Sequence, residues 1–222
     1  MKKSHLIPLI LCFFAASCGK GDDPVPTPGA AVYMSNTAGN VWTYEDTDNN
    51  PPASSVTYNL TSTNKPDTIV NGNPYHIFTK SSTGGSEYYY KNGENYYSFR
   101  SLPASAGGAN IESLYLKANA AVNATWSEVI VLTTPFGPVN VTMTYTMKEK
   151  GISKTVNNIN YTNVIHVSGT LSAPPPFNTG LTSDIHWYYA PKYGLIQNDT
   201  KIDQTAANIH VDTNTKLKSA NF

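Results

Sequence analysis

The sequence predicts an all-β protein: a single antiparallel β domain whose curved sheet closes as a barrel or half-barrel, with a β-sandwich as the alternative. Three observations support this fold class. From Val32 onward, runs rich in β-branched and aromatic residues are separated by clusters of Asn, Gly, Pro and Ser. One run alternates apolar and polar side chains, and two-residue turn sequences join neighbouring runs. Because an open sheet of about a dozen strands would leave bare edges and a bare face, the strands must curl or stack.

Strands are expected along the whole body of the chain, in order at residues 41–45, 54–62, 67–70, 75–80, 86–91, 94–100, 111–117, 125–133, 138–149, 160–171, 184–190, 194–199 and 207–213. The clearest is 138–149, where Val139, Val141 and Met143 begin an apolar face and polar residues occupy the positions between them. Pro138 stands first, where a strand tolerates proline. The one helix-like spacing, within residues 202–209, is too short to predict a helix.

Asn92-Gly93 predicts a hairpin with a type I′ turn, because both central positions of that turn need positive φ. In this register Tyr89 faces Tyr96. The face expected to join the core carries Tyr88, Tyr90, Tyr97 and Phe99. The face expected to meet water carries Glu87, Tyr89, Lys91, Glu94, Tyr96 and Arg100. Two more hairpins are expected, at Asn71-Gly72 and at Asn157-Asn158 with Val156 opposite Ile159.

The N-terminus has the features of an export signal. Lys2 and Lys3 precede an apolar run, Leu6–Ala16, that is too short to span a bilayer as a helix. Small residues then lead to Cys18, and this stretch resembles a bacterial lipobox with Ala15 at the usual leucine position. The resemblance implies lipidation of Cys18, and a plain secretory signal is the alternative. The expected organisation is a signal peptide at 1–17, a lipidated cysteine with a Pro/Gly-rich tether at 18–31, and the β domain at 32–222.

Charge and cysteine content limit the function further. The precursor has 15 basic and 15 acidic residues. Removal of residues 1–17 takes away Lys2 and Lys3 and leaves 13 basic against 15 acidic residues, a net charge of −2. This balance argues against a nucleic-acid partner, which normally requires a basic excess. Cys12 leaves with the signal peptide and Cys18 carries the lipid, so no disulfide is expected.

The segment after the lipidated cysteine suggests where the domain is held. Lys20 followed by Asp22 and Asp23 resembles the acidic export signal of surface lipoproteins in Bacteroides-type bacteria. Alternating prolines at 24–28 favour an extended tether. The expected location is the outer membrane, lipid-anchored and exposed at the cell surface, with the periplasmic face as the alternative.

Two later segments carry a further resemblance. His186-Trp187-Tyr188-Tyr189-Ala190-Pro191 and the Gly194-Leu195-Ile196 that follows resemble a stretch of uncharacterised bacterial lipoproteins with lipocalin-like or lipoprotein-carrier-like sheets. Residues 154–165 resemble the hairpin that precedes this stretch in those proteins. Together the segments cover about a fifth of the chain, and they imply a curved antiparallel sheet without catalytic residues.

The sequence lacks the compact motifs of enzymes. No G-x-S-x-G, H-E-x-x-H, P-loop or G-x-G-x-x-G occurs, so a non-enzymatic protein without cofactor is expected. Asp184 and His186 point the same way on one strand and would form half of a zinc site. A solvated strand face is the preferred reading, because two ligands are missing.

The candidate ligand contacts are Tyr89, Tyr96 and Arg100, which could stack against a sugar or another flat ligand; an ordinary cross-strand aromatic pair is the alternative. Asp67-Thr68-Ile69 resembles an O-glycosylation site of Bacteroides-type exported proteins, with Thr68 as the acceptor. The leading hypothesis is therefore a lipid-anchored domain that binds an apolar small molecule or a glycan. The alternatives are a structural or carrier component of an envelope complex and, third, a hydrolase.

Overall fold

Antiparallel strands make up almost all of the computed structural model, which describes residues 31–102, 109–134, 137–205 and 208–222. Their bounds are β1 Val41–Asp48, β2 Ser54–Ser62, β3 Thr68–Val70, β4 Asn73–Lys80, β5 Ser86–Asn92, β6 Asn95–Ser101, β7 Asn110–Lys117, β8 Thr125–Thr134, β9 Gly137–Val156, β10 Ile159–Ser172, β11 Leu181–Ala190, β12 Gly194–Gln204 and β13 Ile209–Asn221. Each of the predicted strands is present, and the all-β class is confirmed. Cys18 and the predicted signal peptide lie outside the described residues.

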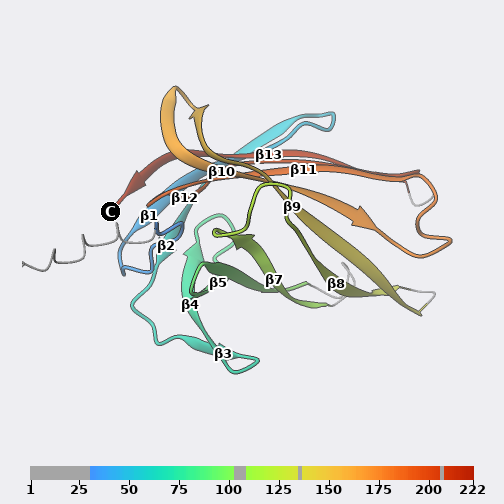
Figure 1. Cartoon of the computed structure of the whole chain (residues 1–222), viewed down its shortest axis with the longest axis horizontal. Helices are drawn as coiled ribbons and strands as arrows, with labels where there is room; N and C mark the ends of the chain where they lie inside the picture. Colours follow the sequence, from blue (N-terminus) through green and yellow to red (C-terminus); the bar gives the residue numbers. More distant parts are fainter. Residues whose placement is uncertain (1–30, 103–108, 135–136, 206–207) are drawn as a thin grey trace, which may run out of the picture. The chain divides into compact units, whose positions relative to one another are not determined.

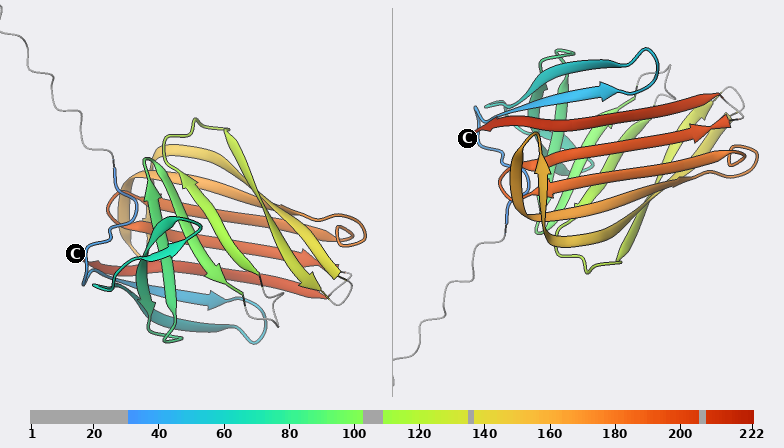
Figure 2. Two further views of the ribbon diagram at one scale, coloured as in Figure 1. Left: turned by 90° about the horizontal axis from the view of Figure 1, so that it is seen from below. Right: turned by 90° about the horizontal axis from the view of Figure 1, so that it is seen from above.

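The strands form one sheet that curls round on itself (Figures 1 and 2). Its order is β7-β6-β5-β4-β2-β1-β13-β12-β11-β10-β9-β8, and β3 pairs with β4 alone. Side chains join the two end strands: Trp126 Nε1 on β8 donates to the Leu114 carbonyl on β7 at 2.7 Å. Nearby, Ser113 Oγ donates to Glu128 Oε1, also at 2.7 Å. The sheet is therefore nearly closed into a barrel. Side-chain hydrogen bonds, and not a ladder of backbone hydrogen bonds, connect β7 to β8.

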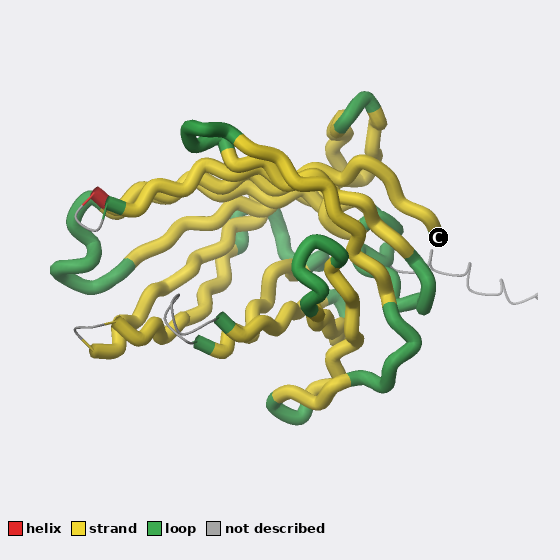
Figure 3. The backbone as a smooth tube through the Cα atoms, turned by 180° about the vertical axis from the view of Figure 1, so that it is seen from behind, coloured by secondary structure: helices red, strands yellow, loops and turns green. Residues whose placement is uncertain are grey.

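Loops and tight turns connect the strands, with a short helical turn at Thr205 (Figure 3). Within the described part of the chain, no helix has the length and apolar character needed to cross a membrane. Two predicted hairpins are confirmed. Asn71 and Gly72 have φ of 50° and 82°, and Asn157 and Asn158 have φ of 49° and 65°, as a type I′ turn requires.

The predicted register of the β5–β6 hairpin is wrong by two residues. Asn92 pairs with Asn95, so the central turn residues are Gly93 and Glu94. Gly93 has φ of 58°, whereas the φ of neither neighbour is positive. Positive φ at the first central position alone is the pattern of a type II′ turn, which glycine favours. Tyr89 therefore faces Ser98, and Tyr96 faces Lys91.

The two faces of this hairpin are also reversed relative to the prediction. A shift of two residues keeps the same side chains together on each face, but Tyr96, expected to be wet, is 1% exposed inside the barrel. The aromatic face expected to join the core lies outside, where part of it packs against Tyr75 on β4. The Tyr75 ring centroid is 5.5 Å from that of Tyr90 and 6.1 Å from that of Phe99. Curvature of the whole sheet, which no local pattern encodes, decides which face is inside.

One end of the barrel is filled by fully buried side chains from many strands, among them Trp42, Phe78, Tyr96, Leu116, Met147, Ile165, Ile196 and Leu217. The start of the domain lies across this end. The Lys192 amide donates to the Val32 carbonyl at 2.6 Å, and the Tyr33 amide donates to the Tyr96 hydroxyl at 3.1 Å. Gly194 permits this crossing, because a Cβ there would lie 2.6 Å from the Tyr33 carbonyl oxygen.

The β3–β4 hairpin is held to β7 by the carboxylate of Glu112. Tyr75 Oη donates to Glu112 Oε1 at 2.5 Å, and Asn71 Nδ2 donates to Oε2 at 2.7 Å. Burial raises the pKa of Glu112, but these hydrogen bonds outweigh burial and hold the pKa below its ordinary value. The ionised carboxylate therefore stabilises the folded protein.

We expect Glu112→Gln to destabilise the protein at pH 7. Hydrogen bonds to charged groups are worth ~1.5–3 kcal/mol when shielded, and the partial exposure of Glu112 reduces this to about 1 kcal/mol. Since the folded-state pKa is lowered, the stabilisation is complete above the ordinary glutamate pKa and is lost as pH falls through the folded value. Urea unfolding of wild type, Glu112→Gln and the control Glu94→Gln between pH 7 and 3 measures this. An equal difference between wild type and Glu112→Gln at both ends of the range would contradict the assignment.

Candidate functional site

The half of the barrel beyond the packed end encloses a cavity of about 310 Å³. Its position follows from the direction of β1 and β5: Trp42 and Lys91 lie near the packed end, whereas Asp46 and Glu87 lie farther along and line the cavity. A barrel packed at one end and hollow at the other is a common form of small-molecule site. We take this interior cavity as the candidate functional site.

Seven aromatic side chains line the cavity: Tyr44, Tyr58, Tyr89, Tyr115, Tyr145, Trp187 and Tyr189. Several are in ring contact, with centroids 5.7 Å apart for Tyr44 and Tyr58, 5.6 Å for Tyr115 and Tyr189, and 5.5 Å for Tyr145 and Trp187. Burial raises the pKa of each of the cavity tyrosines, so every phenol keeps its proton at neutral pH. The wall therefore offers ring faces together with hydroxyl groups.

Charged groups are also present in the cavity, and three of them compensate one another. Lys80 Nζ lies 3.5 Å from Asp46 Oδ2 and 3.9 Å from Glu87 Oε1. The same ammonium lies 3.8 Å from the ring centroid of Tyr58. Hydroxyls bind the remaining carboxylate oxygens: Tyr89 Oη donates to Glu87 Oε2 at 2.6 Å, and Thr215 Oγ1 donates to Asp46 Oδ1 at 2.7 Å. This side of the cavity is therefore polar and internally paired.

Arg100 differs from the other charged residues of the cavity. It lines the cavity from the end of β6 and is exposed. Within the described residues its guanidinium makes no hydrogen bond or ion pair. A planar group with five N–H donors is thus available to a ligand oxygen.

The structure brings together two of the three ligand contacts proposed from the sequence. Tyr89 and Arg100 both line the cavity, on its inner surface and not on an outer wet face. Tyr96 belongs to the packed end, where its hydroxyl donates to the Ala31 carbonyl at 3.2 Å. The sequence analysis did not identify Tyr44, Tyr115 and Trp187 as cavity residues. For Trp187 the alternation along β11 could have done so, because it places Trp187 and Tyr189 on the same face of the strand.

The Trp187 ring depends on a glycine in the neighbouring strand. A Cβ added to Gly169 on β10 would lie 2.6 Å from two carbon atoms of the Trp187 ring and 3.2 Å from Met143 Sδ. The ring therefore lies directly over the backbone of β10. Gly169 allows Trp187 to serve as cavity wall, because any larger residue would push the ring into the space that a ligand would fill.

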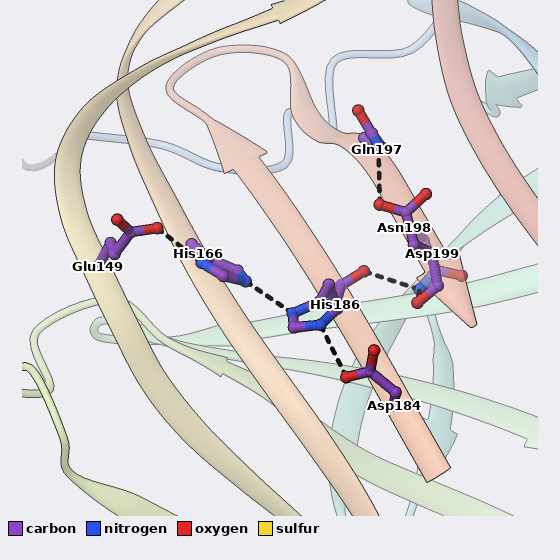
Figure 4. Close-up of polar contacts among 7 residues, drawn as sticks. All are labelled: Glu149, His166, Asp184, His186, Gln197, Asn198 and Asp199. Atoms are coloured by element: carbon purple, nitrogen blue, oxygen red, sulfur yellow. Dashed lines mark hydrogen bonds and ion pairs between the residues drawn. The ribbon is translucent and has the colours of Figure 1, made fainter. Parts of the chain in front are cut away.

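Asp184 and His186, the weak metal candidates of the sequence, lie on the outer face of the sheet, and the cavity wall is on its inner face (Figure 4). His186 Nε2 is 2.8 Å from Asp184 Oδ1, and His186 Nδ1 is 2.9 Å from His166 Nε2. His166 Nδ1 in turn is 2.8 Å from Glu149 Oε2. The four groups form a chain and do not surround a common point. In the described part of the chain, no set of three or more His, Cys, Asp or Glu residues is placed to hold a metal ion.

A third histidine, His76, is hydrogen-bonded in the order of a hydrolase triad. His76 Nε2 is 2.9 Å from Ser62 Oγ, and His76 Nδ1 is 2.9 Å from Asp67 Oδ1. A triad requires that a substrate carbonyl reach the serine oxygen. Ser62 is 1% exposed, so its hydroxyl is closed to substrate in this conformation and the group acts as a buried polar link. Thr68, the proposed glycosylation acceptor, is nearby on β3 and partly exposed.

The fold is similar to that of known bacterial proteins. A crystal structure of a candidate lipoprotein from Parabacteroides distasonis matches with a TM-score of 0.50 and 13% sequence identity, over 86% of this chain and 99% of that chain. A candidate exported protein with YmcC-like fold from Bacteroides fragilis matches with a TM-score of 0.48 and 7% identity, over 86% and 100% of the two chains. No family model and no curated protein matches the chain. The first likeness supports the barrel-like all-β fold, without singling out a lipocalin-like sheet.

We expect Gly169→Ala to disturb the cavity wall. Its methyl group would overlap the Trp187 ring, and overpacking of this kind costs ~1–3 kcal/mol. Urea unfolding should show this loss, and near-ultraviolet circular dichroism should show an altered tryptophan environment. Ser168→Ala, one residue away on the outer face, is the matched control. If Gly169→Ala left both signals unchanged, the close approach of Trp187 to β10 would be wrong.

Proposed function

We propose that the barrel binds a glycan in its cavity. The observation that carries this proposal is the lining itself, in which ring faces alternate with hydroxyl, carboxylate and cationic groups. Sugars present apolar C–H faces and polar hydroxyl edges, so they need both kinds of contact in one site. Tyr44, Tyr115 and Trp187 offer faces, while Asp46, Glu87 and Ser98 offer hydrogen-bond partners.

The lining favours a glycan over the apolar molecule that the sequence also allowed. An apolar ligand would bury Lys80, Asp46 and Glu87 without replacing their contacts with water, which carries a large desolvation cost. A glycan can hydrogen-bond to these groups instead. Arg100 adds a donor fork that suits a carboxylate or another acidic substituent on the sugar.

We propose further that the domain is held on the outer membrane by lipid at Cys18. The basis is the lipobox-like sequence, the acidic residues after it and the proline-containing tether. The fold neighbour from Parabacteroides distasonis is itself a candidate lipoprotein, which supports a lipid anchor. A glycan-binding domain on such a tether would be exposed to glycans outside the cell.

The alternative functions find less support. An assembly subunit should expose a contiguous apolar patch. The exposed large apolar residues of the described chain are instead spread over five strands (β2, β3, β8, β10 and β13) and over segments outside the strands: Val56, Ile69, Val129, Val131, Ile159 and Ile209, with Val32, Val122 and Phe222. A hydrolase centre at Asp184 and His186 would need a substrate cleft, yet this pair lies on the outer face in a closed hydrogen-bond chain.

We expect the purified domain, residues 31–222, to bind oligosaccharides on a glycan array and in calorimetry. Trp187→Ala should weaken binding about tenfold, since an aromatic contact is worth ~0.5–1.5 kcal/mol beyond buried area. Arg100→Gln should weaken binding of acidic glycans at least tenfold and of neutral glycans less, because a hydrogen bond to a charged group contributes ~1.5–3 kcal/mol.

Tyr97→Ala is the matched control, because Tyr97 is an aromatic residue on the outer face of the same hairpin as Arg100. Binding that survives Trp187→Ala and Arg100→Gln but is lost in Tyr97→Ala would place the ligand outside the barrel. Absence of binding to every glycan tested, with the fold intact by circular dichroism, would count against the proposed ligand class.

We expect Cys18→Ser to release the protein from the membrane. Several acyl chains on one residue give stable anchoring, and the serine variant cannot accept them. Wild type should fractionate with the outer membrane and incorporate radiolabelled palmitate, whereas the variant should do neither. Recovery of both proteins in the same membrane fraction would show that Cys18 is not the anchor.

A further inference from the structure

The outer face of β9, β10 and β11 carries a chain of four titratable side chains that the proposed function does not use (Figure 4). Its order is Glu149, His166, His186 and Asp184, with successive N···O or N···N distances of 2.8, 2.9 and 2.8 Å. Each imidazole thus has a carboxylate at one ring nitrogen and the other imidazole at its second ring nitrogen. The two ring centroids are 5.1 Å apart, which fits rings that meet nearly head-on.

The hydrogen bond between the two rings depends on how many protons the pair holds. An ionised carboxylate only accepts hydrogen bonds, so His166 Nδ1 carries hydrogen, and Nε2 of a neutral His166 is then a lone pair. His186 Nδ1 can donate to that lone pair whether or not His186 Nε2 also carries hydrogen for Asp184. Two imidazolium rings, in contrast, would place two N–H groups face to face. The hydrogen bond at 2.9 Å therefore requires that one ring of the pair be neutral.

Burial indicates which ring stays neutral. The His166 side chain is 10% exposed and that of His186 is 30% exposed. Burial lowers the pKa of His166, and the hydrogen bond to Glu149 only partly offsets this effect. The neutral ring is therefore His166, and it accepts a hydrogen bond at Nε2 from His186 Nδ1.

We propose that His166 and His186 form an acid-sensitive clasp that joins β9, β10 and β11 from outside. The clasp is closed while one ring of the pair is neutral, and it opens when both rings are protonated. Because the inner face of β11 carries Trp187 and Tyr189, the clasp fastens a strand that forms part of the cavity wall.

The groups around the pair determine which ring can move. Tyr188 on β11 stacks on His166 with centroids 4.4 Å apart, and Lys154 on β9 lies 3.7 Å from the Tyr188 centroid. Glu149 faces His166 from β9, Asp184 faces His186 from β11, and Asp199 on β12 acts on Tyr188 electrostatically. His166 is held between these groups. When the clasp opens, His186 is the ring that turns toward water.

The dependence on pH follows in sign from these states. As pH falls, a second proton on the pair sets two N–H groups against each other, and the stabilisation disappears. The lowered pKa of His166 favours folding above the ordinary histidine value, and that contribution is lost as pH falls through the folded-state pKa. The stabilisation by the clasp should therefore be complete above the ordinary histidine pKa of ~6.5 and be lost in acid.

The test compares urea unfolding of wild type, His186→Asn and His210→Asn from pH 4.5 to 9. His210 is the matched control, since it also contacts a carboxylate, Asp203, but meets no second histidine. We expect His186→Asn to raise the unfolding constant about tenfold at pH 7 and above and progressively less toward pH 4.5. His210→Asn should not show this loss of effect in acid.

Nitrogen-15 spectra of the imidazoles provide a readout that lost packing would not move. In wild type at pH 7 and above, one ring should show the shifts of a neutral ring protonated at Nδ1, and both rings should show those of imidazolium once the clasp has opened in acid. Two imidazolium rings at pH 7, or a stability difference between wild type and His186→Asn that does not vary with pH, would overturn the proposal.

Discussion

Closure of the sheet is the constraint on which the rest of this structure depends. A barrel of about eight strands has a bore that side chains just fill, and the bore widens with each further strand. Here twelve strands follow one another round the sheet, so the interior exceeds what a single layer of side chains can fill. The domain responds by packing large aromatic residues and the 31–35 segment into one end, and the other end remains hollow. The cavity is thus a consequence of strand number.

The hollow end creates a second requirement, because polar groups that face it are partly removed from water. Carboxylates in or beside it need hydrogen bonds that replace contacts with water. Tyrosine hydroxyls of the cavity wall supply them: Tyr89 donates to Glu87, and Tyr145 donates to Glu128 at 2.7 Å. Since burial raises the pKa of these phenols, they remain donors across the physiological range. The abundance of tyrosine therefore has a physical reason, as the residue combines a wide apolar ring with a donor that satisfies an acid.

The sequence predicts strands well and their inner face poorly, and the β5–β6 hairpin shows why. Alternation sorts Tyr88 from Tyr89 correctly, because side chains on a strand have a period of two whatever the partner strand. Which set faces inward depends on the curl of strands distant in sequence. Bulges add a second uncertainty: the register shifts between Tyr96 and Tyr97, so alternation along one strand does not carry over to the next. The barrel class follows from local patterns, whereas the lining of the cavity requires the folded sheet.

Strand β11 shows how one segment can hold two kinds of site. Period two places Trp187 and Tyr189 on the inner surface and Asp184 and His186 on the outer one, which is visible in the sequence. The partners of the outer pair are not visible, since Glu149 and His166 come from other strands and the β9–β10 register shifts beside His166. Sequence spacing alone therefore suggested half of a metal site, whereas sheet register supplies a second imidazole and turns the same residues into a chain of hydrogen bonds that protonation of both rings would break. Any change that moves β11 relative to β10 must act on both faces together, because the ring of Trp187 lies over Gly169 while His186 meets His166.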